Sequence, residues 1–66
     1  MVEDIDIWRA AHVLVREHGD NATHHAAMQV ARMAVKHDAR GEAVWTRIYD
    51  IVNDMLRGRR ASDAVH

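Results

Sequence analysis

Apolar residues recur along this chain at intervals of three and four, which is the spacing of one face of an α-helix. Over residues 4–18 these positions fall on one side, with Arg9 and Arg16 opposite them. Gly19 follows, and glycine readily takes the left-handed conformation that closes many helices. Asp20 is then a candidate N-cap of the next helix. The pattern predicts an amphipathic helix over 4–18 and a turn after it.

The segment of about residues 21–37 has a narrow polar stripe and a broad face of small residues. Its small side chains are mainly those of Ala26, Ala27, Ala31 and Ala34. Short side chains let neighbouring helices approach closely, toward the lower end of the usual distance of about 8–10 Å between helix axes. We therefore expect this segment to form the central and most buried helix.

The third segment, about residues 39–57, carries the clearest apolar stripe in the chain. Asp38 is placed to accept hydrogen bonds from the first turn, and Gly58 is placed to end the helix. Gly41 falls within the stripe, where glycine costs about 1 kcal/mol relative to alanine. It indicates close packing against a neighbour or a helix start at Glu42, and we favour close packing.

Short turns between three helices place successive helices antiparallel. The pattern therefore predicts an all-α, up-down-up three-helix bundle with helices at about 4–18, 21–37 and 39–57. We expect residues 1–58 to form one domain, and residues 59–66 to form a flexible tail because few of them are apolar. The residues expected to anchor the core are Trp8, Leu14, Trp45, Ile48 and Val52.

A chain of 66 residues without cysteine has a small core and no disulfide to support it. A core of this size rarely supplies more than about 3–5 kcal/mol, so a metal or a second chain is the remaining form of support. Several apolar residues are left over once one bundle is packed. We therefore predict a homodimer or docking on a larger protein. The interface candidates are Ile5, Val13, Met28, Val35, Tyr49 and Ile51.

Several short motifs follow one another along the chain, namely Ile7-Trp8, His18-Gly19-Asp20, Asp38 with Gly41, and Trp45 with Ile48. Their order resembles a family of short bacterial helical proteins. The resemblance covers about residues 6–56. That family has no assigned activity, so the resemblance implies a helical fold and no particular chemistry. The adjacent His24 and His25 and the Arg59-Arg60 pair depart from the family's pattern.

Nucleophiles suited to catalysis are scarce in this sequence. There is no cysteine, Ser62 lies in the expected tail, and Thr23 and Thr46 lie off the main apolar stripes. Catalysis also needs a base within hydrogen-bond reach of the nucleophile and a cleft, and a small bundle offers little room for one. We expect the protein not to be an enzyme, with no catalytic residues and no cofactor.

Six histidines make a metal-binding protein the first alternative. Two histidines on one helical face need a separation of three or four residues, and no two in this chain have it. His24 and His25 point about 100° apart on a helix. We therefore expect the histidines to be solvated or capping residues, and we predict no metal ligand.

A helix, a short turn and a second helix are also the outline of a DNA-binding unit, which is the second alternative. The net charge is −1, and Asp50 and Asp54 lie on the polar face of the third segment. Nucleic-acid binding requires a basic surface, so we expect no nucleic-acid partner.

The acidic N-terminus lacks the basic and apolar regions of a secretory signal, and no apolar run reaches the 18 or so residues of a membrane span. We therefore expect a cytoplasmic protein with no membrane partner. Arg59 and Arg60 precede Ser62 in the form of a kinase site. We favour a simpler reading, in which the two arginines stabilise a helix C-terminus.

Overall fold

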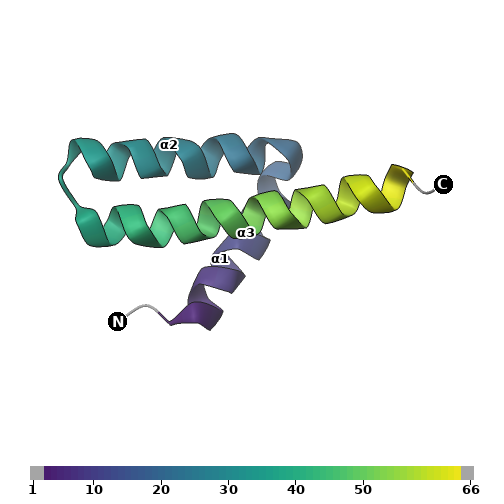
Figure 1. Cartoon of the computed structure of the whole chain (residues 1–66), viewed down its shortest axis with the longest axis horizontal. Coiled ribbons are helices and arrows are strands. Elements are labelled where there is room, and N and C mark those ends of the chain that lie inside the picture. The colour runs from purple at the N-terminus through teal and green to yellow at the C-terminus, as the bar shows by residue number, and fades with distance from the viewer. Residues whose placement is uncertain (1–2, 65–66) are drawn as a thin grey trace.

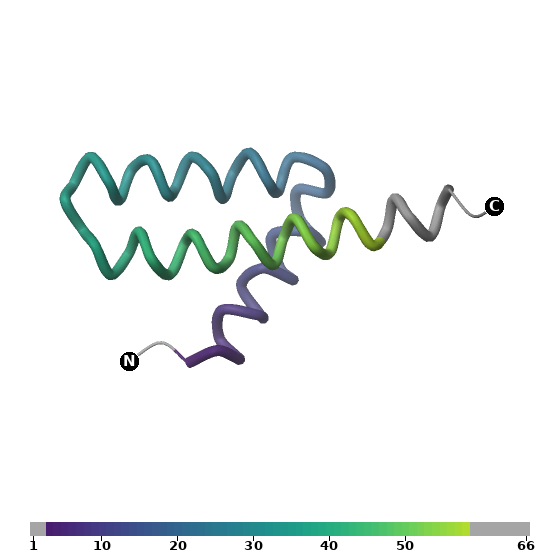
Figure 2. Tube along the Cα trace, viewed as in Figure 1, coloured from purple at the N-terminus to yellow at the C-terminus, as the bar shows by residue number. Residues whose placement is uncertain are grey.

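The computed structural model describes the backbone of residues 3–64 (Figure 1) and the side chains of residues 3–58, which form the coloured part of the trace in Figure 2. No strand occurs among these residues, so the predicted all-α class is confirmed. The elements are α1 (Asp4–His18), the short 3-10 turn η1 (Gly19–Asn21), α2 (Ala22–Val35) and α3 (Ala39–Ala64), shown in Figure 1.

Helices α2 and α3 lie side by side as a hairpin, whereas α1 crosses α3 obliquely (Figure 1). Helix α1 packs mainly against α3 and makes few contacts with α2. The prediction of an up-down-up three-helix bundle is therefore wrong. One physical reason is that α2 buries only Ala22 and Ala26, both near its N-terminus. Such short side chains allow α1 and α2 to approach closely where they meet. They give α1 no long apolar surface on α2 against which to pack.

The turn after α1 follows the sequence prediction in part. Gly19 has a φ of 56°, and its amide donates to the carbonyl oxygen of Val15, so the predicted helix end at this glycine is confirmed. Its ψ of −128° lies outside the left-handed helical region. The predicted capping of the next helix by Asp20 is wrong. Helix α2 begins later, at Ala22, and Asn21 at its N-cap position makes no side-chain capping hydrogen bond.

A tight turn joins α2 to α3, and α2 ends two residues earlier than predicted. His37 takes a φ of 59°, which is unusual for a residue with a side chain. Its amide donates to the carbonyl of Ala34 at 3.1 Å, and the amide of Asp38 donates to Met33 at 2.9 Å. This pair of hydrogen bonds is the Schellman motif, in which the left-handed residue is usually glycine.

The start of α3 agrees with the sequence prediction. The Asp38 carboxylate accepts a hydrogen bond from the amide of Gly41 at 2.9 Å, so Asp38 is the N-cap. A Cβ atom on Gly41 would lie 2.6 Å from the sulfur of Met33 in α2. The close packing inferred for Gly41 is therefore confirmed, and the alternative start at Glu42 is wrong.

Helix α3 continues past Gly58 to Ala64, so its predicted end at residue 57 is wrong. Glycine in a helix costs only about 1 kcal/mol relative to alanine, which weakens a helix without ending it. The flexible tail expected at residues 59–66 stays a prediction. Residues 65–66 and the side chains of 59–64, including that of Ser62, lie outside the part of the chain that the structure describes.

The core lies where α1 and α2 meet the middle and later turns of α3, and it is made of small and branched side chains. Alanines supply three of its nine positions, and Val52 is the only larger side chain that is fully buried among the residues described. The three alanines bury less apolar area than the valine, leucine and isoleucine side chains, so they contribute less to the stability of the fold. The buried residues are Ile7, Ala11, Leu14, Val15, Ala22, Ala26, Ile48, Val52 and Leu56.

The five predicted core anchors have different environments. Leu14, Ile48 and Val52 are buried, and Trp45 is half-buried against the core. Trp8 is 52% exposed, so its prediction as a core anchor is wrong. Helix α3 covers the face of α1 that carries Ile7, and the indole lies at the edge of that face.

Candidate protein interface

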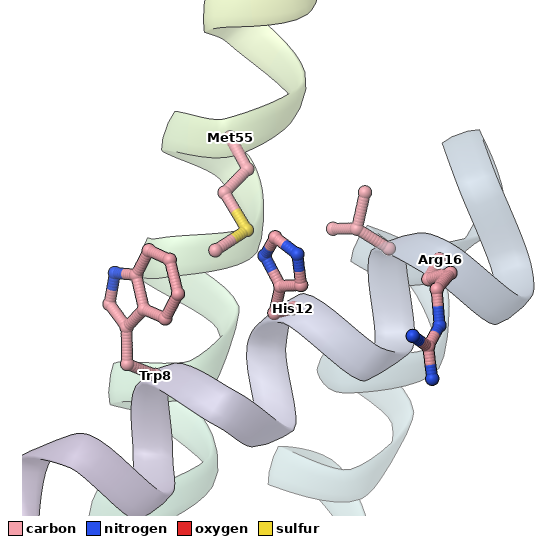
Figure 3. Close-up of a pocket in the computed structure, with 5 residues that line it drawn as sticks. Trp8, His12, Arg16 and Met55 are labelled. Carbon is pink, nitrogen blue, oxygen red and sulfur yellow. The ribbon is translucent and has the colours of Figure 1, made fainter.

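A groove lies between α1 and the later part of α3, with a volume of about 420 Å³. Figure 3 shows Met55 reaching from α3 toward Trp8 and His12 on α1. The indole of Trp8 stacks on the imidazole of His12 with ring centroids 5.2 Å apart. We call this surface the Trp8 groove. It is lined by Trp8, His12, Val15, Arg16 and Met55.

The helical period explains why α1 forms this wall of the groove. Residues 8, 12 and 15 are spaced by four and three, so they share one side of the helix. Ile5 precedes Trp8 by three residues and is 56% exposed, which extends the apolar surface toward the N-terminus. Helix α1 therefore has two apolar faces, one in the core and one open to solvent beside it.

A second apolar groove, of about 360 Å³, lies on α2. Met28 and Val35 in this groove are 50% and 79% exposed. Arg32 and Lys36 line the same groove, and the sequence of α2 contains no acidic residue. We call this surface the α2 groove.

The six predicted interface residues do not line one common groove. Met28 and Val35 share the α2 groove, whereas Tyr49 lines a smaller groove with Ala27. Ile51 is half-buried against the core, and Val13 is exposed elsewhere on α1. Ile5 adjoins the Trp8 groove on α1, three residues before Trp8, and Ile51 lies one helical turn before Met55 on α3. That these residues form an interface stays a prediction.

The corner between α1 and α2 brings two histidines together. The rings of His18 and His25 stack with centroids 4.7 Å apart and an angle of 14° between their planes. Spacing rules for a single helix miss this pair, because η1 lies between the two residues. The glycine at position 19 indicates a turn there, but it does not specify which residues of the two helices meet. Within residues 3–58, no group of three or more histidine, aspartate or glutamate side chains is placed to hold a metal ion.

The two threonines weighed as nucleophiles both donate hydrogen bonds. The Thr23 hydroxyl donates to Asn53 Oδ1 at 3.2 Å, linking α2 to α3. The Thr46 hydroxyl donates to the carbonyl of Glu42 at 2.8 Å. Both contacts join a hydroxyl to an amide or carbonyl oxygen, and neither of these oxygens is the base that a nucleophile requires.

Among residues 3–58, few charged groups connect one helix to another. Arg47 of α3 and Asp4 of α1 form an ion pair at 2.6 Å, with both side chains more than half exposed. Exposed pairs contribute about 0–1 kcal/mol, so this contact does little to fix the angle between the helices. None of the described helices combines the length and the apolar character needed to cross a membrane.

Comparisons with models of known families, with curated proteins and with solved structures each find no match to this chain. The resemblance to a family of short bacterial helical proteins therefore stays an expectation.

Proposed function

We propose that the protein is a small helical interaction module that pairs with a second copy of itself through the Trp8 groove and the adjoining Ile5. The observation that carries this proposal is the 52% exposure of Trp8. Tryptophan is among the residues that contribute most to the binding energy of protein interfaces. An indole held by a stack on His12 also loses little side-chain freedom on binding, which favours association.

The accessible area of the chain is large enough to include an interface of ordinary size with a second copy. A compact monomer of 7.5 kDa would expose about 4,200 Å². The chain exposes 5043 Å², because its shape is elongated, with extents of 44 × 22 × 16 Å. The excess of roughly 800 Å² is similar to the area that each partner buries in a standard interface.

The small core also favours self-association. A fold with only nine buried residues in the part of the chain that the structure describes gains stability from any partner that binds only the folded state. Pairing about a two-fold axis is the commonest arrangement of soluble homo-oligomers, and it would cover the Trp8 groove on both chains at once.

Light scattering after size exclusion at micromolar concentration tests the proposal with two matched variants. Trp8→Lys places a charge in the Trp8 groove, and Val35→Lys places the same charge in the α2 groove. We expect a mass near twice 7.5 kDa for the parent and for Val35→Lys, and a mass near 7.5 kDa for Trp8→Lys. A dimer that Val35→Lys dissociates and Trp8→Lys leaves intact would contradict the proposal.

A parent that stays at the mass of one chain would also contradict self-association. The Trp8 groove would then be a docking surface for a different protein, which is the alternative form of an interaction module. An exposed apolar surface of this kind fits either role.

A further inference from the structure

The stacked pair of His18 and His25 lies outside the Trp8 groove and plays no part in the proposed dimer. His18 is the last residue of α1, and His25 lies in the first turns of α2. The short η1 turn between the helices brings their rings to a centroid distance of 4.7 Å. His18 is exposed and His25 is half-buried, so water reaches the pair.

Two imidazoles at this distance can supply two ligands to one metal ion. A zinc–nitrogen bond is about 2.0–2.1 Å long, so one ion can join two nitrogens that lie up to about 4.2 Å apart. The stacked rings do not yet point their nitrogens at a common centre. Because His18 is exposed, its ring can rotate about the Cβ–Cγ bond and bring a nitrogen into that range.

We propose that His18 and His25 bind one first-row divalent metal ion, which links the end of α1 to the start of α2. Imidazole is a suitable ligand for nickel, copper and zinc. Water would complete the coordination, since the described residues offer no third protein ligand there. Affinity should follow the order in which copper(II) binds more tightly than nickel(II).

The ion would strengthen a corner that side chains hold weakly. Helix α1 makes few contacts with α2, and the buried residues that α2 contributes are alanines. An ion that binds the folded chain and not the unfolded chain raises stability in proportion to the logarithm of its concentration. Metal occupancy would therefore stabilise the corner between α1 and α2 within one chain.

The test is thermal unfolding of protein that has been treated with chelator, dialysed and titrated with nickel(II) chloride. We expect the melting temperature of the parent to rise with nickel concentration, and calorimetry to give one ion per chain. His18→Ala and His25→Ala should each weaken binding at least tenfold. The matched controls His24→Ala and His37→Ala should bind as the parent does.

Two results would overturn the proposal. One is a parent that shows no bound nickel at millimolar concentration. The other is binding that survives both His18→Ala and His25→Ala, or that His24→Ala weakens equally. Because His18 is exposed, its variant should keep the fold, which circular dichroism checks. Repeating the titration in Trp8→Lys separates this site from the dimer, and the same affinity is expected there.

Discussion

The carboxylate of Asp38 accepts a hydrogen bond from the amide of Gly41 at 2.9 Å. Asp38 directly follows His37, the residue with positive φ in the turn after α2. This contact starts α3 and fixes where the α2–α3 hairpin closes. Replacing an aspartate N-cap by alanine typically costs about 1 kcal/mol. For Asp38→Ala we therefore expect a fall of roughly 4–8 °C in melting temperature, measured by circular dichroism. Asp54→Ala, at an exposed position within α3, should change the melting temperature little.

Two glycines of α3 should respond in opposite ways to alanine. At Gly58 a Cβ atom would meet nothing within 4 Å, so Gly58→Ala should stabilise the helix by up to about 1 kcal/mol. At Gly41 it would lie 2.6 Å from the Met33 sulfur and 2.7 Å from the capping carboxylate of Asp38. We expect Gly41→Ala to lower the free energy of unfolding in urea. Stabilisation by both variants would show that the hairpin is not closely packed at Gly41.

Glycine should fit the backbone conformation at position 37 better than the native histidine does. A residue with a Cβ atom is disfavoured at a φ of 59°, by roughly 1–2 kcal/mol. Glycine removes this cost, but it also loses more conformational entropy on folding than histidine does. The net effect of His37→Gly should therefore be a stabilisation of about 0.5–1 kcal/mol. His24→Gly, within α2, should destabilise it by about 1 kcal/mol. Urea midpoints of the two variants would show this opposite sign.

Burial, and not side-chain size, should decide which apolar residue contributes most to the free energy of unfolding of the monomer. Val52 is 0% exposed and Trp8 is 52% exposed. Val52→Ala should cost about 2–3 kcal/mol through lost apolar burial and the cavity it leaves. Trp8→Ala should cost less when both variants are unfolded at concentrations low enough to keep the chain monomeric. A larger loss for Trp8→Ala would place the indole in the core.

Local signals in the sequence predicted the helices well. The bounds of α1 follow from its apolar period and Gly19, and the start of α3 follows from Asp38. Gly58 misled the prediction of the helix end, because a glycine ends a helix only when the residues after it favour another conformation. The sequence after Gly58 has no apolar stripe from which a continuing helix could be predicted.

The relative placement of the helices could not be predicted from these local signals. The period of α1 groups Trp8 with Ile7, and only the crossing of α1 over α3 decides which of the two is buried. That crossing depends on the path of η1, which no short motif specifies. The same turn brings His18 and His25 together, so the candidate interface and the candidate metal site both depend on geometry beyond a single helix.

The most direct measurement of the proposed pairing is the fluorescence of Trp8 itself. In a Trp45→Phe variant, Trp8 is the only tryptophan. Its emission and the molar mass are followed together through a dilution series from high micromolar to nanomolar concentration. If the Trp8 groove is the dimer interface, the emission moves to shorter wavelength as the mass rises from 7.5 kDa toward twice that value. A doubled mass with unchanged emission, or a mass that stays at 7.5 kDa at every concentration, would contradict the account.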